Sequence, residues 1–221
     1  MNRCRTLTLK LQTVAVLLLA LFAGLALAAP RTAGPRGAAP VEGTDYVPIA
    51  DGAPYARVAG RVEVAEVFSY TCGACAAFEP QLHAWAARLP ATARLVRVPV
   101  PWQQAYARAY LAGEALGVTA RVHPAVFRAL HDDRALPRNA SVDELATFYA
   151  RHGANVERFR AAYTSERTTA QLDRAAKFIE RSGVEGTPTL VINGRYRVRG
   201  SSFEDTLRIA DHLIARERAA R

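Results

Sequence analysis

The chain has 221 residues, half of them hydrophobic, which is enough for one domain, or a domain with an insertion, around a sizeable core. Its 29 basic and 20 acidic residues give a formal net charge of +9. The sequence has no run of five like charges and no ladder of basic and aromatic residues. The excess charge therefore indicates solvated helix faces rather than a nucleic-acid-binding surface.

Residues 1–28 have the pattern of a secretory signal peptide. Three basic residues within the first ten precede an uncharged apolar run of 14 residues, Val14–Leu27, and residues 26–28 offer a cleavage site with small side chains. The run is shorter than the about 20 residues of a membrane span, although an uncleaved anchor is the alternative. Cleavage would remove Cys4 and export a chain with only Cys72 and Cys75 into an oxidising compartment, which suggests disulfide exchange.

The first strands are expected after a tether. Residues 29–44 are rich in Pro, Gly and Ala and predict a disordered tether. Residues 46–49 predict a short edge strand, and residues 61–70 predict a longer one, whose alternation puts Glu66 on a face with apolar neighbours. Burial of this acid would raise its pKa and allow proton exchange near neutrality. Glu66 could instead reach a surface or pair with Arg97.

A Cys-Gly-Ala-Cys pair, Cys72 to Cys75, directly follows this strand and precedes an Ala-rich run with good helix propensity. Strand, Cys-x-x-Cys and helix in this order are typical of a redox-active pair rather than a metal knuckle. A helix that begins near Cys72 would stabilise its thiolate and lower its pKa. Cys75 lies one turn further in and should be less exposed. We therefore expect Cys72 to be the attacking thiol and Cys75 the resolving thiol.

Other uses of the Cys pair fit the sequence less well. A c-type haem would need His after the second Cys, where the chain has Ala76, and a structural disulfide across so short a loop would remove little chain entropy. A zinc site would need about four ligands, and the histidines show no paired spacing: His83, His123, His131, His152 and His212. We expect no metal and no organic cofactor.

The helix after the Cys pair should extend to about Leu89, with a kink at Pro80. Residues 93–100 predict a second strand, and the strand–helix–strand order predicts that it is parallel to the first and joined by a right-handed crossover. Residues 102–183 then have helical periodicity, with Trp102 among the aromatic residues expected on inward faces. This block contains no strand signal and predicts a helical subdomain.

The C-terminal part returns to the sheet. Residues 189–192 predict a strand, Asn193-Gly194 a hairpin turn and residues 196–199 the returning strand. A last helix follows, and residues 216–221 are expected to be a basic tail that is mostly solvated.

Three features together resemble the DsbA family of thioredoxin-fold periplasmic thiol–disulfide oxidoreductases. They are residues 66–79 around the Cys pair, the segment Gly186–Gly194, and the long helical block between them. The resemblance covers about residue 45 to the C-terminus. It implies an α/β thioredoxin fold, formed by residues 45–101 and 184–221, with residues 102–183 as an inserted helical subdomain.

The resemblance also assigns roles to residues outside the Cys pair. Glu66 matches a buried acid beneath the cysteines that would help to move the proton of Cys75. Pro188 matches a cis-Pro that faces the cysteines, and Thr187 before it would offer its backbone to an extended substrate strand. Glu79 matches an acid that could tune the thiolate, although a solvated Glu is the alternative.

The function that the resemblance implies is the introduction of disulfides into reduced exported polypeptides in the periplasm, by a monomer that a DsbB-like membrane quinone reductase reoxidises. Two departures keep other functions open. Gly73-Ala74 stands where DsbA proteins often have Pro-His. In addition, a Thr before the Pro, here Thr187, resembles the isomerases DsbC and DsbG more than many DsbA proteins. A periplasmic reductase or isomerase is therefore one alternative, and a non-enzymatic peptide-binding or chaperone module is another. The isomerases have a dimerisation domain, for which the segment before the first long strand is too short.

Overall fold

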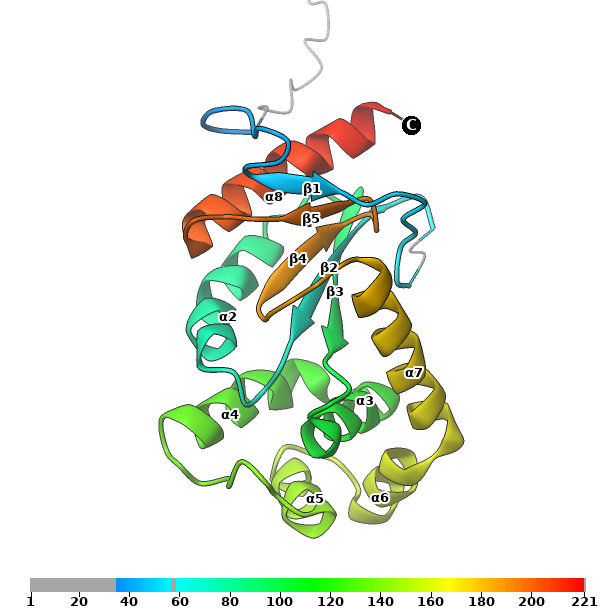
Figure 1. The fold of residues 1–221 in the computed structure, drawn as a ribbon. Coiled ribbons are helices and arrows are strands. Elements are labelled where there is room, and N and C mark those ends of the chain that lie inside the picture. The colour runs from blue at the N-terminus through cyan, green and yellow to red at the C-terminus, as the bar shows by residue number, and fades with distance from the viewer. Residues whose placement is uncertain (1–34, 57–58, 221) are drawn as a thin grey trace, which may run out of the picture. The chain divides into compact units, whose positions relative to one another are not determined.

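The computed structural model describes residues 35–56 and 59–220, so the predicted signal peptide lies outside the described residues. Strands and helices alternate at first, a run of helices follows, and a hairpin and a last helix close the chain (Figure 1). The elements in order are β1 (Tyr46–Pro48), β2 (Val62–Phe68), α2 (Gly73–Ala86), β3 (Ala93–Pro99), α3 (Gln104–Leu116), α4 (Thr119–His131), α5 (Val142–Arg151), α6 (Val156–Thr164), α7 (Glu166–Arg181), β4 (Thr189–Ile192), β5 (Tyr196–Val198) and α8 (Phe203–Ala219).

The strands of the described chain form one five-stranded sheet in the order β1-β5-β4-β2-β3. β2 and β3 are parallel, as predicted, and α2 connects them. β4 is antiparallel to both β2 and β5, and β1 is the edge strand beside β5. The mixed sheet with helices on both faces confirms the predicted α/β thioredoxin-like fold. Every residue of β2 is buried, so an acid on this strand lies inside the protein.

Two apolar cores lie on opposite faces of the sheet. On one face, α2 and α8 contribute Leu82, Trp85, Ile209 and Leu213 to a cluster with β2 and β4. On the other face, α7 contributes Ala175, Phe178 and Ile179. Figure 1 shows α2 and α8 together on one side of the sheet and α7 on the other. The β2–α2 junction is therefore enclosed by packed elements on both faces.

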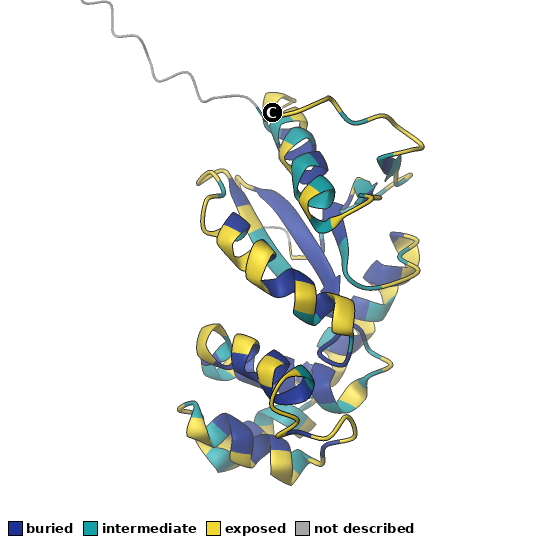
Figure 2. Cartoon of the chain, turned by 90° about the vertical axis from the view of Figure 1, so that its left-hand side faces the viewer, coloured by how far each residue is buried: buried dark blue, intermediate teal, exposed yellow. Residues whose placement is uncertain are grey.

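A third core belongs to the helical block and is formed by buried residues of α3, α4, α5 and α6. Figure 2 shows helices of this block with one buried and one exposed face. The capping box predicted at the start of α5 is present between Ser141 and Glu144. This core also contains Phe68, Tyr70 and Cys75, which come from the end of β2, the following loop and α2. The Cys pair thus lies where the helical block meets the sheet.

Three expectations were wrong in detail. Residues 35–44 of the expected disordered tether are not free of the fold, because Arg208 and His212 of α8 donate hydrogen bonds to the backbone carbonyls of Ala38 and Arg36. Trp102 is 63% exposed, because α3 begins after it at Gln104 and leaves it in the connecting loop. In the C-terminal tail, Arg216, Ala219 and Ala220 are exposed as expected, but α8 continues to Ala219 and buries Glu217 against Asn193. In the part of the chain that the structure describes, no helix is long and apolar enough to cross a membrane.

Candidate active site

The two cysteines occupy different positions at the start of α2. Cys72 is the N-cap residue, with extended backbone angles, and its Sγ accepts a hydrogen bond from the Cys75 backbone N–H at 3.4 Å. Cys72 is partly exposed and Cys75 is fully buried, and both are free thiols. The unpaired N–H groups at a helix N-terminus favour a negative charge on a sulfur at this position. The structure therefore has the exposed and buried thiols that the sequence predicted.

The loop before β4 contacts this site from a distant part of the sequence. The Thr187–Pro188 peptide bond is cis, as the resemblance implied. The Cys72 thiol donates a hydrogen bond to the Thr187 backbone carbonyl, with Sγ 3.3 Å from the oxygen. Thr187 and Pro188 are themselves partly exposed. An extended chain that reaches Cys72 would therefore also meet backbone groups of this loop.

The surroundings shift the pKa values of the two thiols in opposite directions. Burial disfavours the Cys72 thiolate, but hydrogen bonds with the Thr187 side chain and with the Cys75 and Ala74 backbone outweigh it and lower the pKa of Cys72. Burial raises the pKa of Cys75. A thiolate at Cys72 is thus favoured over one at Cys75, which suits Cys72 to exchange with an incoming sulfur.

Glu66 is fully buried in the middle of β2, opposite Arg97 of β3 in the parallel register. Its Oε2 lies 3.1 Å from Arg97 Nε, so the two side chains form an ion pair. Neither oxygen of Glu66, nor this nitrogen, has a hydrogen bond of good geometry. Burial raises the pKa of Glu66 to about 7, against the opposing charge of Arg97. Glu66 can therefore gain or lose a proton near neutrality.

Glu79 provides a second buried carboxylate beside the same arginine. Arg97 Nη2 donates to both Glu79 oxygens, at 2.8 and 3.0 Å, and His123 Nε2 lies 3.3 Å from Glu79 Oε2. Although burial opposes it, hydrogen bonding to His123 and the charge of Arg97 lower the pKa of Glu79. The alternative of a solvated Glu79 was wrong.

Side chains of the helical block hold the loop between β2 and Cys72. His123 Nδ1 lies 2.8 Å from the Tyr70 hydroxyl. His131 Nε2 lies 2.8 Å from the Tyr70 backbone carbonyl, and Arg138 donates to the Thr71 carbonyl at 2.7 Å. The residues immediately before Cys72 are therefore positioned by α4 and the loop that follows it.

The comparisons with known proteins agree with this geometry. A family model described as Thioredoxin matches residues 51–212. The thiol:disulfide interchange protein DsbA of Pseudomonas aeruginosa is 37% identical over 184 residues, which cover 80% of this chain and 86% of that protein. The protein of the same name from Burkholderia cepacia is 32% identical over 213 residues, with 93% and 95% covered. The crystal structure of oxidoreductase DsbA from Xylella fastidiosa has a TM-score of 0.79 and 45% identity, covering 82% of this chain and 100% of that one.

The chain belongs to the thioredoxin-fold DsbA family. It is a thiol–disulfide oxidoreductase, as the sequence predicted.

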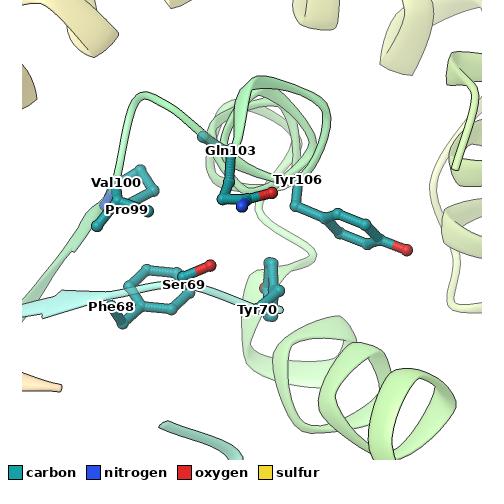
Figure 3. A pocket seen from close by; sticks show the side chains of 8 residues that line it. Phe68, Ser69, Tyr70, Pro99, Val100, Gln103 and Tyr106 are labelled. Atoms are coloured by element: carbon teal, nitrogen blue, oxygen red, sulfur yellow. The ribbon is translucent and has the colours of Figure 1, made fainter. Parts of the chain in front are cut away.

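A small hollow lies beside the loop between β2 and Cys72 in this DsbA-family protein. Its volume is about 10 Å³, which is roughly the room for one water molecule and far below the about 300–1,000 Å³ of a typical small-molecule site. Figure 3 shows Ser69, Tyr70, Gln103 and Tyr106 around it, at the ends of β2 and β3 and the start of α3. Among the described residues, no three His, Cys, Asp or Glu side chains are grouped so that they could hold a metal ion.

Sequence reasoning missed His123 and left Glu79 undecided, although helical spacing carried a signal for both. Glu79 follows the buried Cys75 by four residues, so the two share a helix face. His123 precedes Phe127 by four residues and lies on the same buried face of α4. A polar residue at an inward position of a helix requires a buried hydrogen-bond partner. Here Glu79 and His123 are partners for each other.

Proposed function

We propose that this protein introduces disulfides into reduced exported polypeptides in the periplasm through Cys72 and Cys75. The observation that carries the proposal is the asymmetry of the pair: a partly exposed Cys72 with a lowered pKa at a helix N-terminus, and a buried Cys75 with a raised pKa. A stabilised thiolate favours the reduced form of the enzyme and so makes its disulfide a better oxidant. The relatives are named thiol:disulfide interchange proteins, which supports disulfide exchange as the reaction.

The reaction begins with the oxidised Cys72–Cys75 pair. A substrate thiolate attacks Cys72 Sγ, the bond between the two enzyme sulfurs breaks, and Cys75 leaves with the electron pair and takes up a proton. A second substrate thiolate then attacks the substrate sulfur of the mixed disulfide, and Cys72 leaves as a thiolate. The substrate has lost two electrons to form its disulfide, and the enzyme holds them as a reduced pair. The lowered pKa of Cys72 makes it a good leaving group in the second step.

Glu66 is proposed to supply the proton that Cys75 takes up. The raised pKa of Cys75 means that its thiolate needs a proton at neutral pH. Glu66 is buried in β2, on which α2 packs, and its pKa of about 7 suits proton transfer in this range. The lack of an aligned hydrogen bond to its oxygens supports a carboxyl group that changes protonation during the reaction.

Thr187 and Pro188 are proposed to bind the substrate backbone beside Cys72. The 3.3 Å contact between Cys72 and the Thr187 carbonyl supports this, because a substrate sulfur on Cys72 would lie next to the same loop. Recognition through main-chain groups accepts many sequences. It suits an enzyme that acts on many unfolded chains.

The remaining assignments follow from the family and the sequence pattern. Residues 1–28 are proposed as an export signal and residues 29–44 as a tether. The thioredoxin domain would comprise residues 45–101 and 184–221, with residues 102–183 inserted. The protein is proposed to act as a monomer, without metal or organic cofactor, and to be reoxidised by a DsbB-like membrane quinone reductase.

One feature favours a second candidate, a periplasmic reductase or isomerase. Gly73 has no side chain and Ala74 has only a methyl group, so neither can donate a side-chain hydrogen bond to the Cys72 thiolate. The thiolate then depends on backbone groups and on Thr187. Less stabilisation would make the pair a weaker oxidant.

The proposal is tested with a reduced, unfolded substrate and the oxidised protein. We expect the wild type to form substrate disulfides, Cys72→Ser to be inactive, and Cys75→Ser to retain the nucleophilic Cys72 and to form a mixed disulfide with an oxidised substrate. Formation of that adduct without Cys72 would contradict the assignment. If Cys72→Ser still suppressed substrate aggregation as well as the wild type and the wild type formed no disulfides, the chaperone alternative would replace the proposed function.

A further inference from the structure

His123 is the buried histidine among the described residues, and no step of the proposed reaction uses it. It lies on α4, in the helical block, and contacts two elements of the thioredoxin part. Its Nε2 faces Glu79 on α2 at 3.3 Å, and its Nδ1 faces the hydroxyl of Tyr70 at 2.8 Å. The aromatic rings of Phe68 and Phe127 make T-shaped contacts with the imidazole ring, with centroids 5.2 and 5.1 Å away. His123 is therefore fixed from several sides.

The hydrogen bonds determine which nitrogen carries the proton. Burial lowers the pKa of His123 to about 4, so the ring is neutral at neutral pH and has one donor and one acceptor. The ionised Glu79 carboxylate can only accept. The Nε2–H of His123 therefore donates to Glu79, and Nδ1 accepts from the Tyr70 O–H. Burial also raises the pKa of Tyr70, which keeps this hydroxyl protonated.

This arrangement bears directly on Arg97. Glu79, with a donor from His123, holds Arg97 Nη2 through both of its oxygens, at 2.8 and 3.0 Å. Glu66 is left with the Nε of the same guanidinium at 3.1 Å, without a hydrogen bond of good geometry. The two carboxylates thus share one arginine unequally: Glu79 has the better hydrogen bonds to Arg97, and His123 contacts Glu79 rather than Glu66.

We propose that His123 is a positioning residue that keeps Arg97 bonded to Glu79 and thereby leaves Glu66 weakly paired and able to take a proton. The inference deepens the proposed function, since it rests on Glu66 as the group that exchanges a proton with Cys75. It assigns the helical block a part in tuning the chemistry of the Cys pair.

The charged and titratable groups around Glu66 give the direction of the effect. The charge of Arg97 on β3 lowers the pKa of Glu66, and the charge of Glu79 on α2 raises it. Without the donor from His123, Glu79 is more easily protonated and releases Arg97 toward Glu66. Both changes would lower the pKa of Glu66. Two other titratable groups interact electrostatically with this cluster: Tyr110 on α3, with Arg97 and Glu66, and the exposed His83 on α2, with His123.

The test is a titration of Glu66 by carboxyl-carbon NMR on the reduced, full-length protein, in three variants of His123. In His123→Gln, the amide nitrogen takes the place of Nε2 and can still donate to Glu79. In His123→Asn, the shorter amide reaches only the Tyr70 side, and His123→Phe keeps the ring without either bond. We expect the midpoint of Glu66 to fall by about one pH unit or more in the Asn and Phe variants and to stay near the wild-type value in the Gln variant.

Two further variants keep the test decisive if a His123 variant does not fold. Glu79→Gln removes the charge that holds Arg97, so it should lower the midpoint of Glu66 similarly, and adding His123→Phe to it should give no further fall. His131→Gln, on the same helix but bonded to the Tyr70 carbonyl, is the matched control and should leave the midpoint unchanged. An unchanged midpoint in His123→Phe or in Glu79→Gln would overturn the inference, as would equal shifts in the Gln and Asn variants.

A second readout separates this inference from the proposed function. We expect the pH dependence of disulfide exchange to move with the NMR midpoint across the variants. If the midpoint falls and the pH profile stays in place, His123 positions Arg97 as inferred, but Glu66 is not the proton donor. If the midpoint does not fall, the inference fails whatever the activity.

Discussion

Glu63 and Glu66 lie three residues apart on β2 and are both fully buried, yet their surroundings differ. The carboxylate of Glu63 accepts two backbone hydrogen bonds, from the N–H groups of Tyr55 and Ala56, both at 2.6 Å. Glu66 has an arginine nearby but no aligned donor. Burial raises the pKa of both acids, but at Glu63 the two backbone bonds oppose the shift.

The difference shows that two fully buried acids on one strand can be hydrogen-bonded to very different extents. Glu63 ties the segment before β2 to the sheet, and its lone pairs are used by the backbone. Burial destabilises the ionised carboxylate of Glu66, and no comparable hydrogen bonds offset this, so protonation would stabilise the side chain. We therefore propose that Glu63 has a structural role in β2, whereas Glu66 has the role in proton transfer proposed above.

The largest expected effect is the loss of stability in Glu63→Ala. Two hydrogen bonds to an ionised group, each worth about 2 kcal/mol, are removed, and the N–H of Tyr55 is left buried without its acceptor. We expect the free energy of unfolding to fall by about 4 kcal/mol in urea denaturation. The exchange rate of the molecules that remain folded should not change. A specific loss of exchange in folded Glu63→Ala would remove the contrast between the two acids.

Glu66→Gln should have a pH-dependent effect of the opposite sign. The folded-state pKa of Glu66 is raised from 4.5 to about 7, so the stability linked to its proton is complete below pH 4.5 and is lost as the pH rises through 7. Gln mimics the protonated acid. The variant should equal the wild type at low pH and be more stable by up to about 3 kcal/mol above neutrality.

The same variant should exchange disulfides more slowly, by about 100-fold, the lower end of what positioned proton transfer contributes. Stability is read from urea denaturation at several pH values, and exchange from single-turnover kinetics. A stability difference that is independent of pH would mean that Glu66 is ionised throughout, as a structural ion pair would be.

Arg174→Met tests the smallest effect. Its guanidinium lies 4.5 Å from the centre of the Tyr55 ring, and its charge opposes the rise in the pKa of Glu63. We expect a loss of about 0.5–1 kcal/mol in unfolding free energy, typical of an exposed cation–π contact. The titration of Glu66 should be unaffected. A shift in the Glu66 midpoint would show that the two ends of β2 are electrostatically coupled after all.

Local signals in the sequence were sufficient for the Cys pair and much of the sheet. Cys72 is the N-cap of α2, and the Asn193-Gly194 turn has positive φ at both residues, 52° and 68°, as a two-residue hairpin requires. These features depend on neighbouring residues, so a short stretch specifies them. The proximity of Thr187 to Cys72, 115 residues away, was available only through the family resemblance.

The cluster around Arg97 depends on contacts that no single stretch determines. From the sequence, pairing of Glu66 with Arg97 was only an alternative to a free buried acid. The pairing depends on the register between β2 and β3, which neither strand determines alone. His123 is separated by 44 residues from Glu79 and by 53 from Tyr70, and it reaches them only when α4 docks on the sheet domain. Periodicity indicates that such a side chain points inward, but not which buried group it meets.

The most direct test of the proposed direction of exchange is the equilibrium reduction potential of the Cys72–Cys75 pair against glutathione. We expect a value toward the about −120 mV of DsbA, more oxidising than the about −180 mV of protein disulfide isomerase. The helix N-terminus and Thr187 would then stabilise the Cys72 thiolate sufficiently without a side-chain donor between the cysteines. A value near the about −270 mV of thioredoxin would contradict disulfide donation and indicate a reductase or isomerase.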